Sequence, residues 1–215
     1  MTRKLLFSAA VLLALSGTGC RRPMTFLMYA LFGQETQEVD AAFPDLPGQK
    51  VVVFVFTDEQ VQYEYPLARA RLTKRIAAEL ENRIKGIQVV NTEAVLKFQD
   101  EHTDWVAIDR TELAKQFGAD YMLMVSVIRY TMRAPRSVSL YRGNVEADVS
   151  VYQASLPERR SCVWSSRDNI TETYPEEATT GLLRKEAERI RVETERRFVD
   201  KLVKLFYDHE EEIEL

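Results

Sequence analysis

Hydrophobic residues form two kinds of pattern along this chain, and each pattern predicts one kind of element. The run KVVVFVFT at 50–57 is almost continuously β-branched or aromatic, which is typical of a strand buried on both faces. A second such run, YMLMVSVI, occupies 121–128. Between them, apolar residues recur every fourth position among charged ones, which predicts an amphipathic helix on the sheet: Ala68, Leu72, Ile76, Leu80 and Ile84.

Shorter elements fill the first half of the chain. Residues 87–90 predict a short strand and residues 92–101 a short helix. Asp109, followed by Glu112, resembles a capping box that begins another helix, and Gly118 ends it. This alternation of strands and helices is suited to crossover connections and a parallel sheet.

The second half has a different pattern. Residues 144–151 alternate between polar and apolar, which predicts an antiparallel strand with one wet face, and 162–170 predict another strand. Helical spacing then continues from about 179 to 207. The expected fold is therefore α/β (α+β), a mixed parallel/antiparallel sheet with helices packed on it and a long C-terminal helix, in a single domain over 50–207.

The N-terminal segment has the pattern of an export signal. Arg3 and Lys4 precede an apolar run at 5–15, and small residues then lead into Cys20. This resembles the lipobox of bacterial lipoproteins, in which the Cys is lipidated and becomes the new N-terminus, although Gly17 stands where that motif usually has Leu. The expected division is a signal peptide at 1–19, a lipidated N-terminus and linker at 20–49 and an acidic tail at 208–215. An ordinary cleaved signal, or an uncleaved anchor that includes 24–32, stays open as an alternative.

Charge argues against a nucleic-acid partner. The chain has 29 basic and 33 acidic residues, and removal of residues 1–19 takes away two basic residues and no acidic one. Neutralisation of phosphates requires a surface rich in Lys and Arg. A net acidic mature chain is therefore not expected to bind nucleic acid.

Few residues carry catalytic chemistry. His102 and His209 are the only histidines, and neither has partners at metal-ligand spacing, so no metal or cofactor is expected. Cys162 lies in a strand pattern and is expected to be a small buried hydrophobe. No phosphate-binding glycine loop and no nucleophile–His pair occur in the sequence. Carboxylates cluster near Asp104 and Asp109 and leave an envelope hydrolase open as an alternative.

One loop is the best candidate for binding a partner. Residues 57–65 follow the carboxyl end of the first strand, where ligands gather in open α/β sheets. The candidate partner-binding residues there are Gln60, Gln62, Tyr63 and Tyr65, since tyrosines are favoured interface anchors. The alternative is a plain connecting loop whose tyrosines pack on the core.

Three segments within 50–173 carry a family resemblance. They are ARLTKRIAAELENRIKGIQVVNTEAVLKF, TELAKQFGADYMLMVSVIRY and VSVYQASLPERRSCVWSSRDNIT. Their order resembles that of envelope lipoproteins and periplasmic domains of three types: the lipoprotein activator of a peptidoglycan synthase, the curli-secretion lipoprotein and the N-terminal domain of the Tol propeller protein. The linker of this chain, at 34–48, is much shorter than the tether of the synthase activator. Unlike the membrane-spanning hairpins of the curli protein, the strand at 145–151 has a charged alternate face, which disfavours a pore.

Together these patterns predict a lipoprotein that carries palmitate and faces the periplasm. The protein is not expected to be an enzyme. Its membrane contact is through the N-terminal lipid, and the resemblance implies a protein partner in cell-wall or secretion machinery. An oligomeric secretion subunit is a further alternative. The sequence sets neither the oligomeric state nor the choice between inner and outer membrane.

Overall fold

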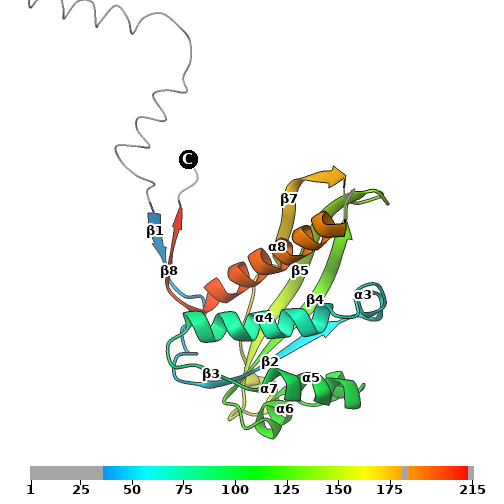
Figure 1. Ribbon diagram of the computed structural model, residues 1–215. Coiled ribbons are helices and arrows are strands. Elements are labelled where there is room, and N and C mark those ends of the chain that lie inside the picture. Colours follow the sequence, from blue (N-terminus) through cyan, green and yellow to red (C-terminus); the bar gives the residue numbers. More distant parts are fainter. Residues whose placement is uncertain (1–35, 181–183, 213–215) are drawn as a thin grey trace, which may run out of the picture. The chain divides into compact units, whose positions relative to one another are not determined.

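A six-stranded mixed sheet is the centre of the protein (Figure 1). The computed structural model describes residues 36–180 and 184–212. Strands lie in the order β3-β2-β4-β5-β6, and β7 also pairs with β5. The two neighbours of β2 run parallel to it, whereas the β4–β5, β5–β6 and β5–β7 pairs are antiparallel. Their bounds are β2 Lys50–Thr57, β3 Gln88–Val89, β4 Tyr121–Arg133, β5 Leu140–Gln153, β6 Cys162–Ser165 and β7 Ile170–Thr180.

The central strand β2 is buried on both faces, as its continuous apolar run predicts. Successive side chains point to opposite faces of a strand, so β2 feeds two hydrophobic cores. Val51, Val53 and Val55 belong to the larger core, whereas Val52 and Phe54 belong to the smaller one. The strand order and the helix at 184–203 confirm the expected mixed sheet and long C-terminal helix.

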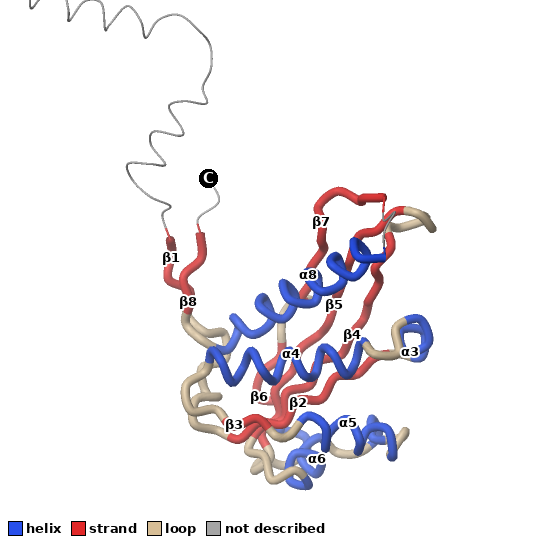
Figure 2. Tube along the Cα trace, viewed as in Figure 1, coloured by secondary structure: helices blue, strands red, loops and turns tan. Residues whose placement is uncertain are grey.

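Helices cover the two faces of the sheet unequally (Figure 2). The long helices α4 (Ala68–Arg83) and α8 (Arg184–Val203) pack on the face of the larger core. On the opposite face, α5 (Thr92–Glu101) and α6 (Arg110–Gln116) pack against β2 and the first part of β4. The exposed side chains of Ile128 and Arg129 show that this cover ends partway along β4.

Short elements join these layers. They are α3 (Glu59–Glu64), the 3-10 turn η1 (Trp105–Ala107), α7 (Glu158–Ser161) and η2 (Lys204–Phe206). Asp58 caps α3, because its Oδ1 accepts a 2.7 Å hydrogen bond from Val61 N. Asp109 caps α6 as the sequence predicts, accepting a 2.6 Å bond from Thr111 N.

The second half differs in detail from the expectation. Residues 162–170 are not one strand, because a bend separates β6 from β7, and β7 extends to Thr180, where a helix was expected to have begun. Cys162 is exposed, so its expected role as a buried hydrophobe is wrong. It begins β6, an edge strand paired with β5, and an edge strand lacks a second neighbour that would cover it.

The segment expected to be a linker packs in part on the core. Phe43 and Leu46 are buried there, and Phe43 N donates a 3.0 Å hydrogen bond to Leu205 O. The sequence pattern did not anticipate this packing. It places the start of the folded unit at Asp40, ahead of β2.

Strand β1 (Thr36–Val39) pairs with β8 (His209–Glu212), and β8 falls within the expected acidic tail. Apart from His209, this strand pair belongs to a separate small unit. The signal peptide, Cys20 and the apolar stretch at 24–32 lie outside the described residues. Among the helices described, none combines the length and apolar character needed to cross a membrane.

Candidate functional site

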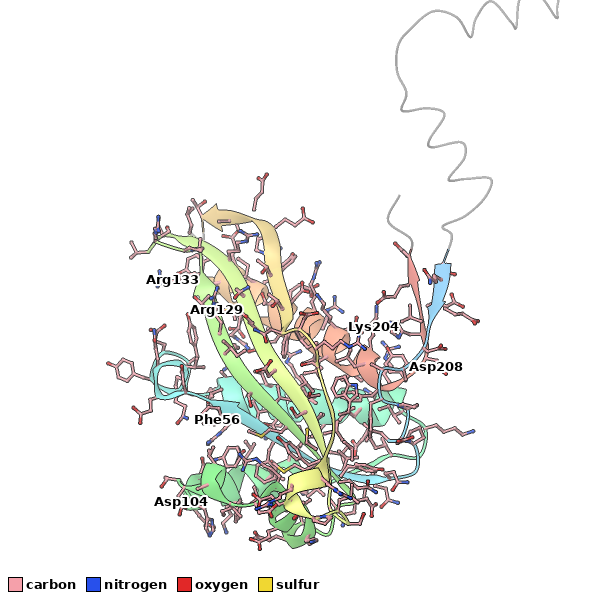
Figure 3. All side chains as sticks on the ribbon, turned by 180° about the vertical axis from the view of Figure 1, so that it is seen from behind. Phe56, Asp104, Arg129, Arg133, Lys204 and Asp208 are labelled. Carbon is pink, nitrogen blue, oxygen red and sulfur yellow. The ribbon has the colours of Figure 1, made fainter. Side chains whose placement is uncertain are left out.

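A small cleft opens at the carboxyl end of β2. Thr57 ends the strand, the Asp58 cap turns the chain into α3, and α5 with η1 brings Gln99 and Trp105 to the other side. The cleft encloses about 110 Å³ and is also lined by Gln62 and Arg69. Figure 3 labels Phe56 and Asp104 at this edge of the sheet.

Two residues that line this cleft each have a buried polar atom without a hydrogen-bond partner among the described residues. The atoms are Oγ1 of Thr57 and Oε1 of Gln99, whose residues are 1% and 2% exposed. The other end of the Gln99 amide is used, since Nε2 donates a 3.1 Å bond to Val55 O. A buried polar group without a partner costs about 1–3 kcal/mol, so native proteins retain few of them. Such a pair at a cleft is suited to a ligand group that forms hydrogen bonds.

Exposed apolar side chains occur on the three elements that contribute Gln62, Arg69 and Val106 to the cleft. Tyr63 in α3 is 89% exposed, Leu67 at the start of α4 is 62% exposed, and Val106 in η1, which lines the cleft, is 38% exposed. Burial of apolar surface is the main driving force for association, and a pocket beside a tyrosine is a common arrangement in interfaces. The cleft and these three residues form the candidate site.

The structure separates the four residues that the sequence singled out. Gln62 lines the cleft and donates from Nε2 to Thr57 O at 2.7 Å, and Tyr63 is free in solvent. Gln60 is exposed and bonds within its own helix to Glu64 at 3.2 Å. Tyr65 has a structural position, because its Oη accepts a 3.1 Å bond from Met132 N and its ring packs on Tyr130.

The carboxylates proposed for hydrolysis do not meet at one point. Asp100 pairs with Arg69, Asp109 caps α6, and Glu101 lies 3.7 Å from Lys97. Asp104 precedes η1 and is exposed. A glycosidase requires two carboxyl groups that face one bond, so this arrangement does not favour the hydrolase alternative. The described residues also contain no group of His, Cys, Asp or Glu able to hold a metal ion.

A buried ionic cluster was missed by the sequence interpretation. Glu195 of α8 is fully buried and contacts Arg71 and Arg75 of α4 at 2.8 and 3.3 Å, and Arg191 of its own helix at 2.9 Å. Tyr130 of β4 also donates to it. The i, i+4 spacing of Arg71 with Arg75, and of Arg191 with Glu195, is the signal that would have indicated it.

The contacts of this cluster hold α4, β4 and α8 together, so we call it the brace. Burial, followed by the negative charge of Glu195, raises the pKa of Tyr130 and keeps its hydroxyl protonated. For Arg71, burial opposes the charge, but the bond to Glu195 raises the pKa overall. Both carboxylate oxygens of Glu195 are occupied by donors, so the cluster joins α4, β4 and α8 and offers no free base.

Comparisons with known proteins identify no family. No protein-family model matches the chain, and no curated protein matches it by sequence. Among solved structures, a PelC dodecamer from Paraburkholderia phytofirmans is 13% identical and covers 78% of this chain and 97% of its own, with a TM-score of 0.42. Lipoprotein GNA1162 from Neisseria meningitidis is 18% identical over 68% of this chain and 96% of its own (TM-score 0.40). Protein XCC0632 from Xanthomonas campestris is 14% identical over 79% and 90% (TM-score 0.49). With similarity this distant, function has to be argued from the residues of this chain.

Proposed function

We propose that this chain is a binding module of the bacterial cell envelope, held at a membrane by lipid on Cys20, and that it docks a protein partner at the end of β2. The observation that carries the proposal is that Thr57 and Gln99, which line the cleft, each hold a buried oxygen without a hydrogen-bond partner among the described residues. The partner inserts a side chain or backbone group that hydrogen-bonds to this pair.

The surrounding residues supply the affinity. Tyr63 and Leu67 expose most of their surface, and their burial contributes about 25 cal/mol per Å² of apolar area removed from water. Arg69 is already paired with Asp100, so this ion pair gives the site no strong net charge. A partner of mixed apolar and polar surface fits such a site better than a highly charged one.

The module works by contact and not by catalysis. The envelope location rests on the sequence, in which Arg3, Lys4, an apolar run and Cys20 follow one another as in an export signal. Of the carboxylates proposed for hydrolysis, Asp109 caps a helix and Asp100 and Glu101 are in ion pairs, whereas Asp104 is exposed. Binding that positions a partner requires neither a shared carboxylate site nor a metal.

Crosslinking in living cells tests the docking site. A photoreactive benzoylphenylalanine replaces Tyr63 in the full chain, and a second strain carries it at Arg159, which is exposed on α7. We expect a discrete crosslinked product from position 63 only, and its loss when Leu67→Asp is added. Identical products from both positions, or none from position 63, would overturn the proposal.

The lipid anchor has its own test. Cells grown with an alkyne-labelled palmitate should label the native chain, and Cys20→Ser should abolish that label. A cleaved but unlabelled chain would support an ordinary export signal instead. This result is independent of the crosslinking result, so the location and the docking site are judged separately.

A further inference from the structure

Four arginines gather on the face of the sheet that the helices leave uncovered. They come from β4, from the turn that follows it and from β5, and they line a groove of about 380 Å³: Arg129, Arg133, Arg136 and Arg142. Figure 3, viewed from behind, shows Arg129 and Arg133 on the outer part of the sheet, with α4 and α8 behind it. The groove therefore lies on the face opposite the long helices.

Protein contacts orient two of these arginines, Arg133 and Arg142, and leave some of their N–H donors unused. Arg142 Nε donates a 3.2 Å bond to Pro175 O, and Arg133 donates to Val138 O and stacks on the Tyr141 ring at 5.3 Å. A guanidinium has five N–H donors in a fixed fork, so several donors on each side chain are left for a ligand. Fixed orientation reduces the entropy lost when a ligand is bound.

The balance of charge in the groove is strongly positive. The described residues that line it include four arginines and no acidic side chain. Glu146, beside the groove, lies 3.7 Å from Arg129 and also accepts a 2.7 Å bond from Asn169. This one carboxylate leaves most of the positive charge of the four arginines uncompensated. Like charges held close together repel, so an anion bound between them would stabilise the groove.

The residue types in the groove favour an oxyanion. All its cations are arginines, whose planar forks match carboxylate and phosphate oxygens in pairs, whereas lysine acts as a point charge. Thr131 and Thr173 add hydroxyl groups to the lining. The volume lies within the range of small-molecule sites, about 300–1,000 Å³.

Arg136 has a backbone conformation that L-residues other than Asn and Asp rarely adopt. Its φ is 59°, in the left-handed region that glycine occupies at no cost. Hydrogen bonds from Ser139 N and Leu140 N to Ser137 Oγ hold the turn around it. Glycine would form the same turn with less strain, so an arginine here indicates a requirement for its side chain.

We infer that this groove binds a small molecule that carries a phosphate or carboxylate group, of about the size of a sugar. The guanidinium groups of Arg129, Arg133, Arg136 and Arg142 grip the oxyanion, and the threonine hydroxyls contact the rest of the ligand. This site is separate in sequence and in its lining residues from the cleft at the end of β2.

Titration of the purified chain, freed of its export signal, tests the inference. Binding of inorganic phosphate, glucose 6-phosphate, glucuronate and neutral glucose is measured by NMR chemical-shift changes and by calorimetry. We expect at least one anion to bind at the groove and glucose not to bind. Tighter binding of glucose 6-phosphate than of inorganic phosphate supports a sugar phosphate, and preference for glucuronate supports a sugar carboxylate. Equal affinity for inorganic phosphate and glucose 6-phosphate would overturn a ligand of the size of a sugar.

Matched variants locate the effect. Arg129→Gln with Arg133→Gln should weaken anion binding about tenfold or more, as expected for the loss of charge-assisted hydrogen bonds. Arg159→Gln with Arg160→Gln, two exposed arginines on α7, should leave it unchanged. Arg136→Gly should weaken binding while the melting temperature stays level or rises, which separates lost contact from lost folding. Absence of binding by every anion, equal weakening by both double variants, or binding only to anionic lipid vesicles would overturn the inference.

Discussion

Tyr130 Oη donates a 2.5 Å hydrogen bond to Oε1 of Glu195, and the two residues lie on the long strand β4 and the long helix α8. The same hydroxyl accepts a 3.0 Å bond from Arg71 on α4. One buried carboxylate therefore connects three elements that the chain places far apart in sequence. A buried charge is tolerated only when it is paired and hydrogen-bonded, so all these partners depend on one another.

Replacement of the carboxylate should destabilise the fold. Glu195→Gln keeps the shape of the side chain but leaves Arg71, Arg75 and Arg191 without their shared negative charge. We expect a loss of about 3 kcal/mol in the free energy of unfolding, at the low end for breaking a buried ion pair, because the arginines remain partly in water. Urea denaturation followed by circular dichroism measures it.

The tyrosine provides the matched control. Tyr130→Phe removes the hydrogen bond to Glu195 and the one accepted from Arg71, but it keeps the ring contact with Tyr65, at 5.0 Å between centroids. We expect a smaller loss, about 1–2 kcal/mol. If Glu195→Gln were no more destabilising than Tyr130→Phe, the carboxylate would not be the centre of the brace.

A close approach between β5 and α8 should make Gly143 irreplaceable. A Cβ atom at this position would lie 2.0 Å from Oγ1 and 2.8 Å from Cβ of Thr194, which is fully buried. Gly143→Ala should therefore destabilise the protein by about 1–3 kcal/mol through overpacking. Adding Thr194→Ala removes the nearest atom, so the double variant should lose less than the sum of the two single losses. Simple additivity in thermal unfolding would contradict this contact.

The first half of the fold could be predicted because its signals are local. The continuous run of β2 and the four-residue spacing of α4 each reflect burial of one element against a sheet. The boundary between β7 and α8 could not be found this way. The residues of β7 are mostly half-buried or exposed and give no clear alternation, so the helical pattern that follows was extended back over its end.

The site was predictable only in part, for a related reason. The end of β2 follows from topology, and the loop containing Gln62 and Tyr63 was identified from it. The unpartnered atoms of Thr57 and Gln99 depend on how α5 packs against β2, which the sequence alone does not specify. The arginine groove likewise combines residues that become neighbours only through the β4–β5 register, in which Arg129 pairs with Glu146.

Acid should weaken one ion-pair network on the surface of α8. Hydrogen bonds from Arg196 and Arg197 lower the pKa of Glu193 from 4.5 to about 2. Because the folded pKa lies below the unfolded one, the stabilisation is complete above about pH 4.5 and is lost as the pH falls towards 2. NMR titration of the Glu193 carboxyl should show this midpoint, and Arg196→Gln should raise it.

The effect on stability should be modest, because the arginines are exposed and salt screens them. The free energy of unfolding of the Glu193→Gln variant should fall less steeply between pH 4.5 and pH 2 than that of the native chain. A native Glu193 midpoint near 4.5 would show that these hydrogen bonds do not persist in solution.

Thr57 should show opposite effects on stability and on binding. Its buried Oγ1 has no partner among the described residues, so Thr57→Val removes an unsatisfied hydroxyl while keeping the shape. We expect the free energy of unfolding to rise by up to about 1 kcal/mol, since burial of the unpaired group costs that much or more. The crosslink from position 63 should nevertheless weaken, because the partner loses a hydrogen bond at the cleft.

Thr57→Ser keeps the hydroxyl and should retain the crosslink while losing stability through the missing methyl group. If Thr57→Val were destabilising and left the crosslink intact, the hydroxyl would serve the fold and the cleft would not be the docking point.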